Sequence, residues 1–129
     1  MKEPIRRLPE SELEIMLAIW QADGPVTSTY VGEKMTQHQW ATTTILNFLA
    51  RLVDKGFLRR DRQGKSNRYT PLIQEEEYLR QESRSFLQKL YGNSVKNMVA
   101  ALYHDHTIDE SDLQELRDFL DAQGREEGS

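Results

Sequence analysis

Hydrophobic residues near the start of the chain recur at the spacing of an amphipathic helix. Leu13, Met16, Leu17 and Trp20 follow the i, i+3, i+4, i+7 pattern, with mostly polar residues around them. This spacing predicts a helix over 10–22 with one buried face. A Gly-Pro pair soon follows and ends the helix.

Two further helices are predicted in the same part of the chain. A short one begins after Thr27, whose hydroxyl can accept a hydrogen bond from the first amides of a helix. Val26, just before it, is expected to form a short strand. A longer helix covers 41–55 and ends at Gly56, a residue type favoured just past a helix end. Its buried stripe is predicted to consist of Ile45, Phe48, Leu49, Leu52 and Val53.

After Gly56 the pattern changes from helical spacing to short extended runs. Two strands are predicted, over 57–61 and 67–71, because a Gly-containing turn at 62–65 separates them. Pro71 suits the end of an edge strand. Three helices followed by a hairpin are typical of a winged helix-turn-helix domain, whose third helix enters the major groove of DNA.

From Glu75 onward the chain predicts three more helices. Three consecutive glutamates suit the start of the first of them, because a helix N-terminus is partly positive, and Gly92 ends it. The second carries an apolar stripe over 95–103, and the third is capped by Asp109 or Ser111. The expected fold class is therefore mainly α with a small β-hairpin: a winged helix-turn-helix domain plus a three-helix C-terminal dimerisation region.

The apolar stripes of these C-terminal helices predict a homodimer. The expected domains are a winged helix over 1–73, a helical dimerisation region over 74–122 and a polar, disordered tail over 123–129. Three helices are too few to bury so many large side chains in their own core, and a second copy is the simplest partner. Packing against the chain's own winged helix is the alternative. The expected dimerisation residues are Leu79, Phe86, Leu87, Leu90, Tyr91, Val95, Met98, Val99, Leu102, Leu113, Leu116, Phe119 and Leu120.

The charge of the chain is unevenly distributed. The whole chain has a net charge of −4, whereas residues 1–73 carry 11 Lys or Arg against 8 Asp or Glu, and residues 74–129 carry 6 against 13. Within 51–68 there are 7 basic and 2 acidic residues. A basic segment inside an otherwise acidic chain indicates a local contact with nucleic acid, although a solvated surface would have the same composition.

The predicted stripe of helix 41–55 fixes its opposite face, which presents Thr43, Leu46 and Asn47. Asn47 can form two hydrogen bonds with an adenine edge, and Leu46 can contact a thymine methyl group. The positive start of the helix and the cations around the hairpin turn can bind phosphates. The alternatives are ordinary helix caps at 42–44, a marginal core position for Leu46 and a solubilising turn. The residues predicted to contact double-stranded DNA are Trp40, Thr42, Thr43, Leu46, Asn47, Arg51, Arg62, Lys65 and Arg68.

Other chemistry finds little support in the sequence. The chain has no cysteine, which excludes disulfides, thiolate metal sites and a cysteine nucleophile. It also has no Gly-rich phosphate loop and no nucleophile elbow, so neither catalysis nor a cofactor is expected. His104 and His106 flank Asp105, but a third metal ligand is not evident nearby, so a polar loop is the preferred interpretation. No apolar run reaches the roughly 20 residues that span a bilayer, and no signal peptide precedes the first helix, so a cytoplasmic location is expected.

Five stretches of the chain carry a family resemblance. They are LPESELEIMLAIW at 8–20, TTTILNFLARLVDKGFLRR at 42–60, RYTP at 68–71, FLQKLYG at 86–92 and ELRDFL at 115–120. Together they resemble the penicillinase-repressor family, the BlaI/MecI/CopY group, in the family's order. The resemblance implies an N-terminal winged helix, a three-helix dimerisation region and repression of transcription from a palindromic operator.

The resemblance also implies a route of induction. In the antibiotic-responsive branch, a membrane sensor-transducer with a metalloprotease domain senses β-lactam, and the repressor is then cleaved in its dimerisation region. The equivalent bond here joins Ala101 to Leu102, where that branch has Asn followed by Phe. The copper-responsive branch uses paired C-terminal cysteines, and their absence here argues against thiolate copper sensing.

Two other functions stay open at the level of the sequence. A winged helix can serve as a protein–protein adaptor without binding DNA, although an adaptor has little need for the basic segment 51–68. A repressor of this kind can also respond to a signal other than β-lactam.

Overall fold

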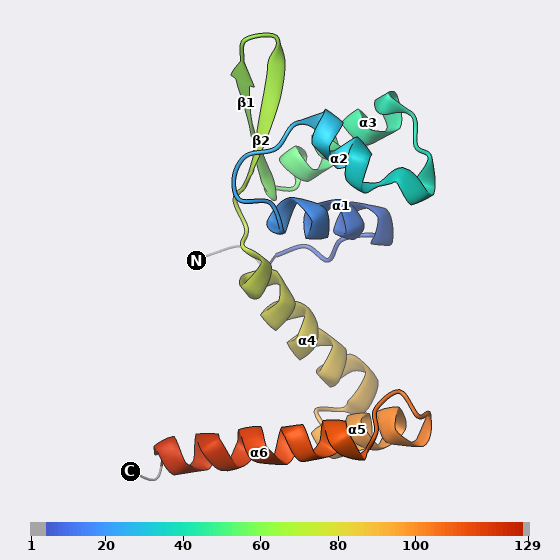
Figure 1. Ribbon diagram of the computed structural model, residues 1–129, viewed down its shortest axis with the longest axis vertical. Helices are drawn as coiled ribbons and strands as arrows, with labels where there is room; N and C mark the ends of the chain where they lie inside the picture. The colour runs from blue at the N-terminus through green and yellow to red at the C-terminus, as the bar shows by residue number, and fades with distance from the viewer. Residues whose placement is uncertain (1–4, 128–129) are drawn as a thin grey trace. The chain divides into compact units, whose positions relative to one another are not determined.

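The computed structural model of the chain describes residues 5–127 (Figure 1). Over these residues it contains six α-helices, one short 3-10 helix and one antiparallel sheet of two strands. Two compact units divide the chain, the first ending at Glu82 and the second beginning at Ser83. The predicted fold class, mainly α with a small β-hairpin, is confirmed.

The first unit contains the winged helix. Its elements are α1 (Glu10–Trp20), α2 (Ser28–Lys34), η1 (Thr36–His38), α3 (Thr42–Asp54), β1 (Leu58–Gln63) and β2 (Ser66–Pro71). Helices α1, α2 and α3 pack on one another, and the hairpin follows α3 directly (Figure 1). The predicted helices and strands of this unit are present, with ends shifted by one or two residues, whereas the short turn η1 was not predicted.

Two local features of α2 follow the sequence prediction. The Thr27 hydroxyl oxygen accepts a hydrogen bond of 3.2 Å from the backbone amide of Tyr30, so Thr27 is the N-cap of α2. Val26 forms a β-bridge with Tyr69 through two backbone hydrogen bonds of 3.0 and 2.8 Å. The start of α2 is therefore fixed against the hairpin.

The hairpin turn is tighter than the sequence predicted. Gln63 pairs with Ser66, which leaves only Gly64 and Lys65 between the strands. Gly64 has a φ of 61°, and a two-residue hairpin turn with glycine in its first position matches the natural twist of the strands. Arg62 and Gln63, expected in the turn, instead extend β1.

One hydrophobic core joins the helices and the hairpin. Glu12 is the one buried charged side chain in the described part of the chain, with Oε1 2.6 Å from Nζ of Lys55. Phe48 and Val53, predicted in the buried stripe of α3, are half-buried at the edge of the core. The core consists of Leu8, Ile15, Met16, Ile19, Val26, Val31, Met35, Ile45, Leu49, Leu52, Phe57, Leu58, Tyr69 and Tyr78.

Tyr78, at the start of α4 (Glu75–Tyr91), belongs to this core. Its side chain is buried, and its ring centroid lies 5.7 Å from that of Trp20 and 5.8 Å from that of Phe57. Its hydroxyl oxygen accepts a hydrogen bond of 3.0 Å from the backbone amide of Leu8. Burial raises the pKa of this tyrosine above its ordinary value of 10.0.

The segment before α1 is held on the same helix. The Gln81 side chain accepts a hydrogen bond from the Ile5 amide and donates one to the Ile5 carbonyl. Arg7 and Glu82 form an ion pair at 3.7 Å. The first unit therefore extends to Glu82, past the boundary expected at residue 73, because the start of α4 supplies part of its core.

The second unit contains the rest of α4, then α5 (Val95–His104) and α6 (Glu110–Glu127). The Ser94 hydroxyl oxygen caps α5 by accepting a hydrogen bond of 3.1 Å from the Asn97 amide. Asp109 and Asp112 cap α6 reciprocally, each carboxylate accepting a hydrogen bond from the other residue's amide. Of the two caps predicted for this helix, Asp109 is the one used.

Helix α6 is longer than expected. It continues to Glu127, so residues 123–127 are helical where a disordered tail was predicted. The physical reason is that Gln, Arg and Glu are good helix formers, and they make up four of the five residues of this segment. Residues 128 and 129 lie outside the described residues.

Candidate nucleic-acid interface

Helix α3 exposes the face that its periodicity predicts. Ile45 and Leu49 point into the core, whereas Thr43, Leu46 and Asn47 are exposed. Leu46 is 40% exposed, so the alternative that it is a core residue is wrong. The face therefore offers a hydroxyl, an amide and an apolar side chain, the groups that read base edges in a major groove.

The N-terminus of α3 has no side-chain cap. Ala41 is the N-cap residue, and no side chain accepts a hydrogen bond from the first amides of the helix. The alternative of ordinary threonine caps at 42–44 therefore does not hold, and Thr42 and Thr43 are exposed. Free amides and the positive end of a helix dipole together suit a phosphate group.

Trp40 lies just before this helix and is half-buried. Its ring stacks on the His38 imidazole with centroids 4.1 Å apart, and its centroid lies 5.1 Å from that of Phe48. The tryptophan is therefore packed between η1 and α3, and its main structural role is to fix where α3 starts. A phosphate contact from Trp40 stays a prediction.

The hairpin, or wing, has two faces that its register defines. Arg60 is paired with Tyr69 and Arg62 with Asn67, so these four side chains, of which Tyr69 is buried, share one face. Arg59, Asp61 and Arg68 lie on the other face, where Arg59 Nε is 2.8 Å from Asp61 Oδ2. Tyr69 and Asn67 of the first face line a depression together with Leu46, so this face borders α3.

A depression of about 280 Å³ lies where the wing meets α2 and α3. Ser28 and Thr29 come from the start of α2, Leu46 from α3 and Asn67 from β2. Lys65 and Ser66 at the hairpin turn complete one edge. Hydroxyls, an amide and an ammonium group around an apolar centre can hold a sugar-phosphate backbone.

Sequence reasoning missed four residues of this surface: Ser28, Thr29, Arg60 and Asn67. Ser28 and Thr29 could have been found from the sequence, because they follow the Thr27 cap at the start of a helix. Arg60 and Asn67 could be placed only once the strand register was known, since a shift of one residue moves every side chain to the other face.

The basic residues of segment 51–68 differ in availability. Arg51 is exposed and its guanidinium lies 5.7 Å from the centre of the Phe48 ring. Lys55 is engaged with Glu12, and Arg59 with Asp61. Arg60, Arg62 and Lys65 are exposed on or next to the face that borders α3.

The apolar residues predicted to form the dimer interface, all of them in the second unit except Leu79, are poorly covered. No side chain of the described part of this unit belongs to the buried core, and Leu90 is 65% exposed. The half-buried members are Leu87, Tyr91, Met98, Val99, Leu102 and Leu113. The exposed members are Leu79, Phe86, Leu90, Val95, Leu116, Phe119 and Leu120.

The other candidate sites have a plain description. Ala101 is exposed and Leu102 half-buried, and both lie inside α5. In the part of the chain that the structure describes, no three His, Asp or Glu side chains gather as ligands for a metal ion. None of the helices in that part is long and apolar enough to cross a bilayer.

Comparisons with known proteins agree with this architecture. Residues 8–122 match the sequence profile of the family described as penicillinase repressor. The chain is 30% identical to the penicillinase repressor of Bacillus licheniformis over 91% of both chains. It is 26% identical to the methicillin resistance regulatory protein MecI of Staphylococcus aureus, over 88% of this chain and 92% of that one. Among solved structures, the DNA-binding domain of the repressor BlaI superposes with a TM-score of 0.51 and 31% identity, over 60% of this chain and 94% of that one.

Proposed function

Since the chain belongs to the penicillinase repressor family and is a transcriptional repressor, we propose that it acts as a cytoplasmic homodimer on a palindromic operator. Each winged helix binds one half-site, with α3 in the major groove and the wing on the adjacent backbone. The observation that carries the proposal is the common surface formed by the exposed face of α3, the start of α2 and the wing.

Three properties of that surface support DNA as its partner. The exposed Asn47 and Thr43 can read base edges, the uncapped start of α3 can bind a phosphate, and Lys65 extends from the hairpin turn. A protein–protein adaptor has no need for this combination of groups. The positive charge of the wing also stands out from the acidic chain as a whole.

The second unit supports a homodimer. Its helices display large apolar side chains with little cover of their own, and burying the area that they still expose would stabilise an assembly. A second copy supplies the same surface in return, as twofold symmetry requires. A twofold dimer also matches an operator with two equivalent half-sites.

A mobility-shift assay over a series of salt concentrations tests DNA binding. The expected result is that a palindromic site outcompetes a random duplex, while the affinity for both falls with salt because condensed counterions are released. The adaptor function would instead give weak binding with no preference between the two duplexes.

We further propose that β-lactam relieves repression through cleavage of the bond between Ala101 and Leu102 by a membrane sensor-transducer metalloprotease. The names of the relatives, which refer to penicillinase and methicillin resistance, support the β-lactam signal. Proteases bind extended substrates, and this bond lies within α5. Cleavage therefore requires α5 to open first.

The cleavage is tested by co-expression with the sensor-transducer, followed by mass measurement of the repressor after β-lactam treatment. The expected product ends at Ala101. A repressor that leaves its operator without being cleaved would favour a different signal. That signal is the second candidate, because this bond joins Ala to Leu where the antibiotic-responsive branch has Asn followed by Phe.

A further inference from the structure

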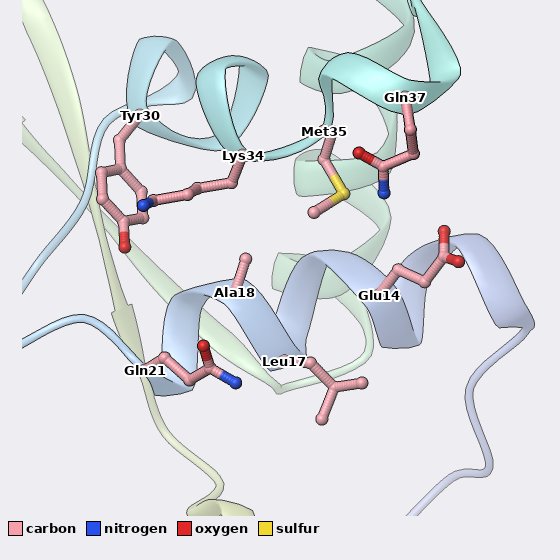
Figure 2. A pocket seen from close by; sticks show the side chains of 8 residues that line it. All are labelled: Glu14, Leu17, Ala18, Gln21, Tyr30, Lys34, Met35 and Gln37. Carbon is pink, nitrogen blue, oxygen red and sulfur yellow. The ribbon is translucent and has the colours of Figure 1, made fainter.

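A second depression lies between α1 and the segment from α2 to η1 (Figure 2). Its volume is about 380 Å³. Glu14 forms one end of the depression, and Leu17 and Ala18 lie at its apolar centre (Figure 2). The Glu14 side chain is partly exposed to solvent, at 32%.

On its other side, Glu14 begins a chain of contacts that ends at α3. Glu14 Oε2 lies 2.5 Å from His38 Nε2. The His38 imidazole stacks on Trp40, with 4° between the two planes. Trp40 then contacts Phe48, a residue of α3 itself. These four side chains link α1 through η1 to α3, and Trp40 lies just before the start of that helix.

The backbone between His38 and α3 needs such support. Gln39 has a φ of 52°, a left-handed conformation that residues other than glycine rarely adopt. Ala41, two residues later, is the N-cap of α3 and contributes no side-chain hydrogen bond. The direction of the chain into α3 therefore depends on the packing of His38 and Trp40.

We propose that His38 is a positioning residue for operator binding. Through Trp40, His38 holds the start of α3, whose free amides would bind a phosphate. A protonated His38 imidazole holds this helix start more firmly than a neutral one. The inference rests on the DNA-binding function proposed above, and it predicts that specific DNA binding strengthens as the pH falls.

The sign follows from the charges around His38. Glu14 of α1 faces it directly, Lys34 of α2 borders the same depression as Glu14, and Arg51 of α3 lies beyond Phe48. A protonated imidazole adds an ionic attraction to Glu14, whereas the neutral ring supplies only an ordinary hydrogen bond. Histidine is the side chain whose charge changes in the physiological pH range.

The expected effect is modest. The side chains of His38 and Glu14 are 29% and 32% exposed, so solvent screens the pair. A partly exposed ion pair corresponds to a change of about twofold to fivefold in an equilibrium constant. Fluorescence anisotropy resolves a change of this size.

The experiment uses the full chain and two duplexes of equal length. One is enriched by the wild-type chain from a random-sequence pool, and the other is random. Affinities are measured over a series of pH values at constant ionic strength, because salt alone changes DNA affinity. The random duplex corrects for the general attraction of a more positive protein at low pH.

For the wild-type chain, we expect the preference for the enriched duplex to rise about twofold to fivefold as the pH falls. His38→Gln and Glu14→Gln should each make this preference independent of pH. Trp40→Phe, which keeps a stacked ring, should retain the pH dependence, as should the control His104→Gln/His106→Gln. Thermal unfolding verifies that each variant is folded. If His38→Gln does not fold, the result for Glu14→Gln alone tests the inference.

Two results would overturn the inference while leaving the proposed function intact. The first is a wild-type preference that does not change with pH, and the second is an unchanged pH dependence in Glu14→Gln. A wild-type chain that enriches no duplex from the pool would instead contradict operator binding itself.

Discussion

Asn47 and Lys65 are both exposed on the surface proposed to face DNA, yet the two residues are expected to act differently. Asn47→Ala removes a group that can read a base edge, so it should reduce the preference for the operator by about 1–3 kcal/mol. Lys65→Ala removes one phosphate contact, so it should weaken all duplexes about equally and lower the salt slope by about 1. Equilibrium titrations of both variants against operator and random duplex make the comparison, and identical behaviour would contradict the assignment of reading helix and wing.

Lys55 illustrates a basic residue that serves stability. Lys55→Met leaves the buried Glu12 carboxylate without its partner and should lower the free energy of unfolding by about 3–5 kcal/mol. The matched control is Arg59→Met, which breaks an exposed pair with Asp61 and should cost no more than about 1 kcal/mol. Urea denaturation measures both, and equal losses would show that the buried carboxylate is better solvated than its position indicates.

Single residues differ in how far the sequence could place them. The exposed face of α3 follows from the helical repeat alone, so Thr43 and Asn47 were predicted correctly as exposed residues. The contact between Glu14 and His38 was not predicted, because it joins residues 24 positions apart on separate elements. A histidine alone before a helix gives no signal of a partner on another helix.

At the scale of elements, the two faces of the wing separate two arginines. Arg60→Ala should weaken DNA binding more than Arg68→Ala, because Arg60 shares the face of Tyr69 that borders α3, whereas Arg68 lies opposite Asp61 on the other face. This ordering revises the sequence interpretation, which named Arg68 and not Arg60 as a DNA contact. Anisotropy titrations at one salt concentration measure the pair, and a larger loss for Arg68→Ala would place the duplex on the opposite face.

The start of α4 gives a prediction about pH. Burial raises the pKa of Tyr78, so this residue favours the folded state below about pH 10, and that stabilisation is lost as the pH rises through the raised value. The free energy of unfolding of the wild-type chain should therefore fall more steeply above about pH 10 than that of Tyr78→Phe. At neutral pH the variant should lose about 1 kcal/mol, the contribution of the hydrogen bond with Leu8.

Denaturation monitored by tryptophan fluorescence measures this difference, with Tyr103→Phe as the control because Tyr103 is 42% exposed. Parallel pH profiles for wild type and Tyr78→Phe would contradict the assignment. The sequence pattern could not show that α4 begins inside the winged-helix core, because its periodicity marks a buried face without naming what buries it.

For the whole molecule, the decisive property is association. Leu90→Asp places a charge on the most exposed large apolar residue of the described chain and should convert the proposed dimer to a monomer in sedimentation. The matched control is Leu46→Asp, which changes an exposed leucine on the proposed DNA face and should leave the proposed dimer intact while DNA binding is lost. A wild-type chain that sediments as a monomer would contradict the dimer, whatever the variants do.

The first unit and the proposed cleavage bond lie on different parts of the chain, and this has a consequence for recovery after induction. A fragment ending at Ala101 keeps Tyr78, Gln81 and the whole of the core that they complete. The cleaved repressor would thus leave a folded, monomeric DNA-binding fragment. This fragment would bind single half-sites weakly and would not repress transcription. Repression would then return only after the fragment is degraded and new repressor is synthesised. Protein turnover would therefore set how long expression continues after exposure to β-lactam ends.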